Sequence, residues 1–505
     1  MNINDAKTQI KNTLSIYLKK DDFGAYKIPK HRQRPIFLLG APGIGKTAIM
    51  AQIASELDLA LVSYAMTHHT RQSALGLPFI KEKNFMGKTY RITEYTMSEI
   101  IASIYDTIEK SGKKEGILFL DEINCVSETL APAILEFLQY KTFGRHAIPD
   151  GWLVVTAGNP PEYNKSVREM DLATMDRLKV LEVKEDYGIW RQYAKKVNLH
   201  PAITNYLDLK KKDFYRIETT IDGKEYVTAR GWEDLSESLY LYEETNLAVD
   251  EPLIYQYLHH PQVAKSFATY YELYQTYQKN YNVRAILEGE YKATTLPKIS
   301  ETTFDEKLSL VGLLVASLNE SSNAYQGQAD YLTYLTQTLR EFKTTLETTK
   351  TTKDILKSTK ETIYQEREAL GFAGSLDRAK NKVMLETLGF LDKLEISFLK
   401  NPEQNAETLL TLMKAQFNDL VSTWDGLGER LKTEITNSLD FTYSYFGDGE
   451  LFLIFLTELA TNEALARLIA ERNVEAYYQH ADKLKHHTQG DKLQKLAQNH
   501  FKEAF

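Results

Sequence analysis

The strongest constraint on this chain is a glycine-rich segment that ends in a lysine and a threonine. It fits the pattern G-x-x-x-x-G-K-[ST] at every fixed position and consists of Gly40, Ala41, Pro42, Gly43, Ile44, Gly45, Lys46 and Thr47. Glycines let successive backbone N–H groups curve around a phosphate, the lysine brings a cation to the terminal phosphates, and the threonine hydroxyl can ligate Mg²⁺. An apolar stretch, 35–39, precedes the pattern and a helical stretch, 47–57, follows it. We therefore predict a strand, a phosphate-binding P-loop and a helix.

A second signature is an apolar strand that ends in two carboxylates, Asp121 and Glu122. The preceding residues, 116–120, predict a buried parallel strand, and ligands bind beyond the carboxyl ends of such strands. Asp121 is expected to hold Mg²⁺ together with Thr47, and Glu122 to orient and deprotonate the attacking water. Two acids at a strand end are common without catalysis, but the upstream P-loop favours the catalytic interpretation.

A third apolar strand, 152–157, is followed by Gly-Asn-Pro-Pro, which places Asn159 at its tip. Asn-Pro is a turn dipeptide, so this asparagine could simply cap a turn. Beside a nucleotide its amide could instead position the hydrolytic water. The buried, parallel character of the strand favours the second interpretation.

These motifs resemble those of AAA+ ATPases and, within them, the MoxR-like and dynein-related clade. The resemblance covers roughly the first half of the chain and extends to Met-Asp-Arg at 175–177 and Thr-Ala-Arg-Gly-Trp-Glu at 228–233. It implies that Asn159 is sensor 1, that Arg177 is an arginine finger acting on the neighbouring subunit, and that Arg230 is sensor 2 from a helical lid. Arg168 is a second candidate for the finger. Spacing alone favours simpler interpretations, in which Arg177 is a surface cation at a helix end and Arg230 is an ordinary salt-bridge partner in the lid.

The predicted fold class is an α/β P-loop NTPase with a helical lid, followed by an all-α C-terminal region. The α/β domain is expected over 1–185, the lid over 186–285 and the helical region over 286–505. A hairpin around 222–223 is expected to carry sensor 2, and the tyrosines of the lid are interpreted as packing residues. Apolar residues at steps of three and four predict a long coiled-coil-like helix over 331–369, forming an arm or a hairpin.

Composition narrows the function classes further. A net charge of -8 does not favour a protein dedicated to binding nucleic acid or an anionic membrane. Cys125 is the only cysteine, and neither a signal pattern nor a spanning apolar run is present, so we expect a soluble cytoplasmic protein with a buried thiol. Acidic or cysteine partners do not recur at ligand spacing around the C-terminal histidines, which are expected to form a solvated helix face. These are His480, His486, His487 and His500.

The resemblance implies Mg²⁺-dependent ATP hydrolysis in a ring, which we expect to be hexameric. It also implies a protein client that the ring remodels or matures, often together with a protein that carries a von Willebrand A-type domain. Two alternatives remain open: a nucleotide-gated switch or scaffold with slow turnover, and a GTP-driven ring related to restriction systems. The rate of turnover and competition between ATP and GTP distinguish them.

Overall fold

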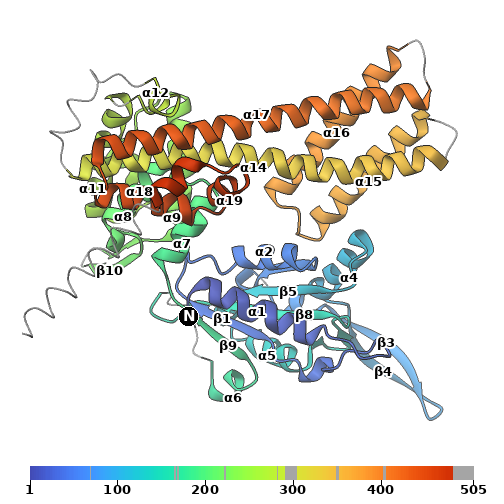
Figure 1. Ribbon diagram of the computed structural model, residues 1–505. Helices are drawn as coiled ribbons and strands as arrows, with labels where there is room; N and C mark the ends of the chain where they lie inside the picture. The colour runs from blue at the N-terminus through green and yellow to red at the C-terminus, as the bar shows by residue number, and fades with distance from the viewer. Residues whose placement is uncertain are drawn as a thin grey trace, which may run out of the picture. The chain divides into compact units, whose positions relative to one another are not determined.

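The computed structural model describes residues 1–68, 70–163, 166–167, 170–220, 223–280, 282–290, 304–348, 352–401 and 405–481. The chain divides into two compact units (Figure 1). The first unit comprises 1–190, 228–231 and 357–385, and the second comprises the remaining described residues. The boundaries at 185 and 285 predicted from the sequence stay a prediction.

The first unit is built on a parallel five-stranded sheet with the strand order β2-β5-β8-β1-β9. Its strands are β1 (Ile36–Gly40), β2 (Ala60–Ala65), β5 (Gly116–Asp121), β8 (Trp152–Gly158) and β9 (Lys179–Val183). The central strands read as continuous apolar runs because helices cover both faces of the sheet. All five strands were predicted from the sequence, where β2 was expected over 60–66 and β9 over 180–183.

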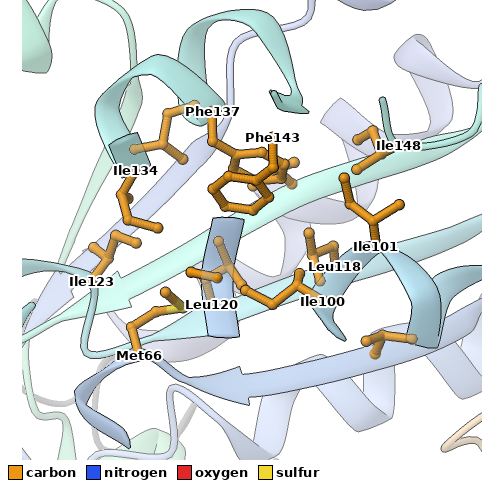
Figure 2. Packing of buried hydrophobic residues seen from close by; sticks show 14 of the residues in the cluster. Met66, Ile100, Ile101, Leu118, Leu120, Ile123, Ile134, Phe137, Phe143 and Ile148 are labelled. Carbon is orange, nitrogen blue, oxygen red and sulfur yellow. The ribbon is translucent and has the colours of Figure 1, made fainter. Parts of the chain in front are cut away.

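Two hydrophobic cores lie on opposite faces of this sheet, and β5 contributes to both. Successive side chains of a strand point to opposite faces. Leu118 and Leu120 accordingly belong to one core, shown in Figure 2, whereas Ile117 and Phe119 belong to the other. The first core contains residues of α4 (Glu99–Ser111) and α5 (Ala131–Tyr140), and the second contains residues of α1 (Ile3–Tyr17) and α2 (Ala48–Glu56).

The start of α5 differs from the sequence-based expectation. A helix over 127–140 with Ser127 as its N-cap was predicted, but α5 begins at Ala131 and Leu130 is the capping residue. Residues 127–130 form a turn instead, in which the Leu130 N–H donates to the Ser127 carbonyl over 3.0 Å. Proline is favoured in the first turn of a helix, so Pro132 fixes the later start.

Two hairpins complete the first unit. β3 (Pro78–Phe85) and β4 (Lys88–Tyr95) pair antiparallel and extend away from the sheet (Figure 1). β6 (Thr142–Phe143) and β7 (His146–Ala147) form the second, shorter hairpin. The sequence predicted a hairpin around 86–88 and a short hairpin or loop over 142–150. The remaining short helices are α3 (Arg71–Leu75) and α6 (Leu172–Met175).

A segment distant in sequence packs against the edge strand β2 of the first unit. Ala373 is fully buried in the core drawn in Figure 2, and its carbonyl accepts a hydrogen bond of 2.8 Å from the Leu61 N–H. Gly374 has a left-handed φ of +64°, and a Cβ there would lie 3.1 Å from the Leu61 carbonyl oxygen. An unpaired strand edge is prone to wrong pairing, so this segment protects β2. The sequence did not predict the contact.

The second unit contains the β10–β11 hairpin and most of the helices. The hairpin consists of β10 (Arg216–Thr220) and β11 (Gly223–Val227). The remaining helices of the chain are α7 (Tyr187–Lys196), α8 (Pro201–Leu209), α9 (Ala229–Glu244), α10 (Glu251–Tyr255), α11 (Pro261–Asn280), α12 (Val283–Leu287), α14 (Phe304–Thr348), α15 (Thr352–Phe372), α16 (Arg378–Leu399), α17 (Ala406–Phe446), α18 (Glu450–Thr461) and α19 (Glu463–Glu471). Most of α15 and the start of α16 belong to the first unit. Within the second unit α14 packs along α17 and against α18 and α8 (Figure 1).

Several tyrosines within 186–285 are packing residues, as predicted, whereas Tyr226 and Tyr255 are exposed. Tyr206, Tyr271 and Tyr274 are buried. Tyr206 packs edge-on against Phe267 with ring centroids 5.2 Å apart, a favourable aromatic arrangement. The buried Trp232 indole donates 3.1 Å to the Phe214 carbonyl.

Two predictions for the C-terminal region are wrong. The helix predicted over 331–369 is described as two helices, since α14 ends at Thr348 and α15 begins at Thr352, and 349–351 lie outside the described residues. Six threonines between 344 and 352 lower the helix propensity there. His480 is buried rather than solvated and packs against the rings of Tyr443 and Phe452. His486, His487 and His500 lie outside the described residues.

None of the described helices combines the length and the apolar character that crossing a membrane requires.

Candidate nucleotide-binding site

The strand order brings the predicted motifs to one edge of the sheet. β8 lies between β5 and β1 and pairs in parallel with both. The carboxyl ends of these three strands lead directly into Asp121, Asn159 and the P-loop that follows Gly40. Motifs that are far apart in the sequence therefore end side by side, at the place where open α/β sheets bind ligands.

The P-loop needs glycine at specific positions. Gly43 and Gly45 have φ values of +73° and +89°, which residues with a Cβ rarely adopt. A Cβ on Gly43 would lie 2.9 Å from Cβ of Thr228. The backbone N–H groups can therefore form the curved anion site that a phosphate requires.

Lys46 is a buried cation whose hydrogen-bond acceptors are all neutral. Its side chain donates to the carbonyls of Gly40 and Ala41 over 2.8 and 2.7 Å, and to Oδ1 of Asn159 over 2.9 Å. Burial lowers the pKa of Lys46 to about 8, an effect that Asp121 and Glu122 partly offset and Arg230 reinforces. The charge is desolvated but not paired by a direct carboxylate bond, so it suits an incoming phosphate.

Thr47 and Asp121 offer the oxygen ligands of a magnesium site. The Thr47 hydroxyl donates 2.7 Å to Oδ2 of Asp121, and the other oxygen of that carboxylate accepts 2.9 Å from the Glu122 N–H. Mg²⁺ prefers carboxylate, hydroxyl and phosphate oxygens, so these two residues fit the ion next to a nucleotide.

Glu122 is held in an unusual conformation. Its φ is +55°, in the left-handed region that non-glycine residues seldom occupy, and such strain is common where side chains are aimed at a ligand. Its Oε2 accepts a hydrogen bond of 2.8 Å from the hydroxyl of Thr67. Sequence reasoning missed Thr67. Thr67 lies just after the end of β2, which neighbours β5 in the sheet, and this position is the signal that could have indicated its role.

Asn124 positions the strand end that carries Asn159. Its Nδ2 donates 2.8 Å to the Asn159 carbonyl, and a Cβ on Gly158 would lie 2.4 Å from its Oδ1. The close approach explains why glycine precedes the asparagine. The sequence did not indicate this contact.

The predicted arginines occupy different environments. Arg230 is exposed in the first turn of α9, near enough to Lys46 to lower its pKa. Arg177 is also exposed, just after α6, and its N–H donates 3.1 Å to the Thr174 carbonyl. Arg168 lies outside the described residues. The roles of Arg177 and Arg230 stay predictions.

Cys125 is half-buried rather than fully buried. Burial, reinforced by Glu122 and Asp121, raises the pKa of its thiol. A thiol held protonated in this way is a poor nucleophile and a poor metal ligand.

A comparison of the sequence with known protein families agrees with this architecture. Residues 35–178 fit the AAA domain of the dynein-related subfamily. Comparison with curated proteins gave no match. The first unit thus contains an AAA domain, and the predicted fold class is confirmed. The match supports a nucleotide-dependent AAA+ ATPase, which implies ATP as the nucleotide, whereas the MoxR-like clade stays a prediction.

The pKa of Lys46 predicts how ATP affinity depends on pH. Phosphate favours the charged ammonium, so binding requires proton uptake once the free protein has lost that proton above about pH 8. Affinity should be flat below that value and fall up to about tenfold per pH unit above it. Calorimetry in buffers of different ionisation enthalpy would measure the proton uptake.

Arg230→Gln is the matched control, because Arg230 lowers the pKa of Lys46. The variant should move the break in affinity to higher pH. An affinity that does not change between about pH 7 and about pH 9.5 would show that Lys46 keeps its proton throughout.

Proposed function

We propose that the chain is a Mg²⁺-dependent ATPase that remodels or matures a protein client as a ring. The observation that carries the hydrolytic part is the contact of three motifs at one sheet edge. The Lys46 ammonium donates a hydrogen bond to Oδ1 of Asn159, and the Thr47 hydroxyl donates one to Oδ2 of Asp121.

The residues divide the chemistry of phosphoryl transfer between them. The P-loop amides and Lys46 hold the phosphates of ATP, and Thr47 and Asp121 would hold Mg²⁺, which neutralises charge on the β and γ phosphates. Glu122 accepts a proton from the attacking water, and the Asn159 amide fixes the position of that water. The Thr67 hydroxyl holds the Glu122 carboxylate before the substrate is in place.

Glu122→Gln should bind ATP within a few-fold of the wild-type affinity and hydrolyse it at least ~100-fold more slowly. The base is lost, while the hydroxyl and carboxylate at Thr47 and Asp121 remain. Steady-state phosphate release and equilibrium nucleotide binding measure the two properties separately.

Lys46→Ala is the complementary control. It should lose ATP binding itself, because it removes the cation that holds the phosphates. Near-wild-type turnover by Glu122→Gln would contradict the assignment of the base.

We further propose that Arg177 completes the site of a neighbouring subunit. Arg177 is exposed, and it lies between the strand end that carries Asn159 and the strand β9. A guanidinium delivered to the γ-phosphate neutralises charge that develops in the transition state, and arginine fingers contribute about 10³ to 10⁵ in rate. Hydrolysis would then require assembly, for which we propose a hexamer.

Arg177→Ala should keep ATP affinity within a few-fold but lose turnover. Mixing it with the Glu122→Gln chain should restore part of the activity, because some interfaces then pair an intact Glu122 with an intact neighbouring Arg177. Turnover of verified mixed rings is the measurement. Failure of rescue would contradict action across the interface, and the same mixing with Arg168→Ala would test the other finger candidate.

The β3–β4 hairpin supports the proposal of a protein client. Ile80 is 74% exposed and Met86 at the turn is fully exposed, which is unusual for large apolar side chains. Such side chains can bind an apolar stretch of polypeptide. A MoxR-like role beside a von Willebrand A-domain protein in the cytoplasm is consistent with this surface. Proteins retained by the Glu122→Gln chain with ATP would identify the client.

A further inference from the structure

Three potential metal ligands converge in the second unit, on the β10–β11 hairpin and at the start of α11. Glu218 lies on β10, Glu225 lies on β11, and His260 immediately precedes α11. One ligand atom from each lies within 4.8 Å of the others. The backbone holds these elements together, since the Tyr226 N–H donates 2.9 Å to the His259 carbonyl.

The two glutamates lie directly opposite each other in the hairpin. Glu218 and Glu225 are register partners of the antiparallel pair. Like charges at directly opposed positions destabilise a hairpin, and an isolated two-stranded hairpin is only marginally stable. A cation between the two carboxylates would convert this repulsion into attraction.

His260 points into the cluster without a hydrogen bond. Its side chain is only 1% exposed, and neither ring nitrogen has a hydrogen-bond partner among the described residues. Nε2 lies 3.5 Å from Oε2 of Glu218 and 3.8 Å from Oε2 of Glu225, beyond the usual length of a hydrogen bond. A buried imidazole whose nitrogens make no short hydrogen bond is costly unless it is protonated and paired with these carboxylates or ligates an ion, so the arrangement requires a physical explanation.

We propose that Glu218, Glu225 and His260 bind a zinc ion. Ligand bonds of about 2.0–2.2 Å place the ligand atoms of a tetrahedral zinc site about 3.3–3.6 Å apart. The two distances from Nε2 are close to that spacing, and the partly exposed glutamate side chains can move to close the remainder. One imidazole nitrogen with two carboxylate oxygens is a donor set that zinc accepts, whereas Mg²⁺ and Ca²⁺ favour oxygen ligands alone.

Arg216 supplies the outer contact that a ligating carboxylate commonly has. Its Nε donates 2.6 Å to Oε1 of Glu218, which leaves Oε2 facing His260. The hydrogen bond from Arg216 holds the pKa of Glu218 below its usual range, so this carboxylate is ionised at neutral pH.

The ion would fasten both strands of the hairpin to the residue that immediately precedes α11. This matters because β11 runs directly into Thr228 and α9, which carries Arg230. The zinc site is thus a structural clamp within the second unit, and the chain continues from the clamped hairpin to a predicted sensor residue. It is independent of the proposed ATPase activity.

Zinc binding to the full chain, freed of metal by chelation, tests the proposal. Titration with Zn²⁺ against a chromophoric chelator, without nucleotide, should reveal a site that Glu225→Gln weakens at least ~10-fold. Glu218→Gln and His260→Gln should do the same. Replacement of zinc by Co²⁺ should give the visible absorption of a four-coordinate ion, and His260→Gln should change that spectrum.

Matched controls separate this site from other histidines. His259→Gln, the adjacent residue, and His486→Gln with His487→Gln should leave the zinc affinity unchanged. Circular dichroism would establish that Glu225→Gln, at a half-buried position, keeps the fold. The proposal is overturned if the three ligand variants bind Zn²⁺ as tightly as the wild type, or if only the C-terminal histidine changes remove binding.

Discussion

The buried ammonium of Lys46 is the interaction on which the site depends. Its pKa of about 8 means that the folded protein holds this charge at a cost of about 3 kcal/mol relative to water. Neutral oxygens of Gly40, Ala41 and Asn159 hold the cation in place without neutralising it. A bound phosphate would supply the missing counter-charge, so the cost becomes part of the affinity and selectivity for a phosphate ligand.

The sheet makes this arrangement possible. The placement of β8 between β5 and β1 sets Asn159 between the metal-binding side and the phosphate-binding side of the site. Hydrophobic cores on both faces keep the strand ends in register, and the edge contact of Ala373 with Leu61 ties a distant helical segment to the same framework. Rigid strand ends are what a site needs when its side chains must meet within hydrogen-bonding distance.

Much of the first unit could be predicted from the sequence, because its signals are local. Apolar runs gave the five strands, and fixed spacing gave Lys46, Thr47 and Asp121. The contacts of Thr67 with Glu122 and of Asn124 with Asn159 depend on which strands are neighbours, which no local pattern encodes. The cluster at His260 was missed for the same reason, since its ligands are close in space and not at a recognisable ligand spacing. The prediction of a single helix over 331–369 was wrong because it relied on the periodicity of the apolar residues. It gave too little weight to the low helix propensity of the threonines between 344 and 352.

The central claim is that one site holds phosphate, metal and water through residues of three neighbouring strands. Pulsed electron paramagnetic resonance with Mn²⁺ in place of Mg²⁺ tests it directly, with ATP bound to a chain in which hydrolysis is blocked. We expect the spectrum to show phosphorus couplings between the nucleotide and the bound Mn²⁺. The Asp121→Asn variant should bind Mn²⁺ at least ~10-fold more weakly, while its binding of metal-free ATP should persist. If Mn²⁺ bound together with ATP as tightly in the Asp121→Asn and Thr47→Val variants as in the wild type, the central claim would be contradicted.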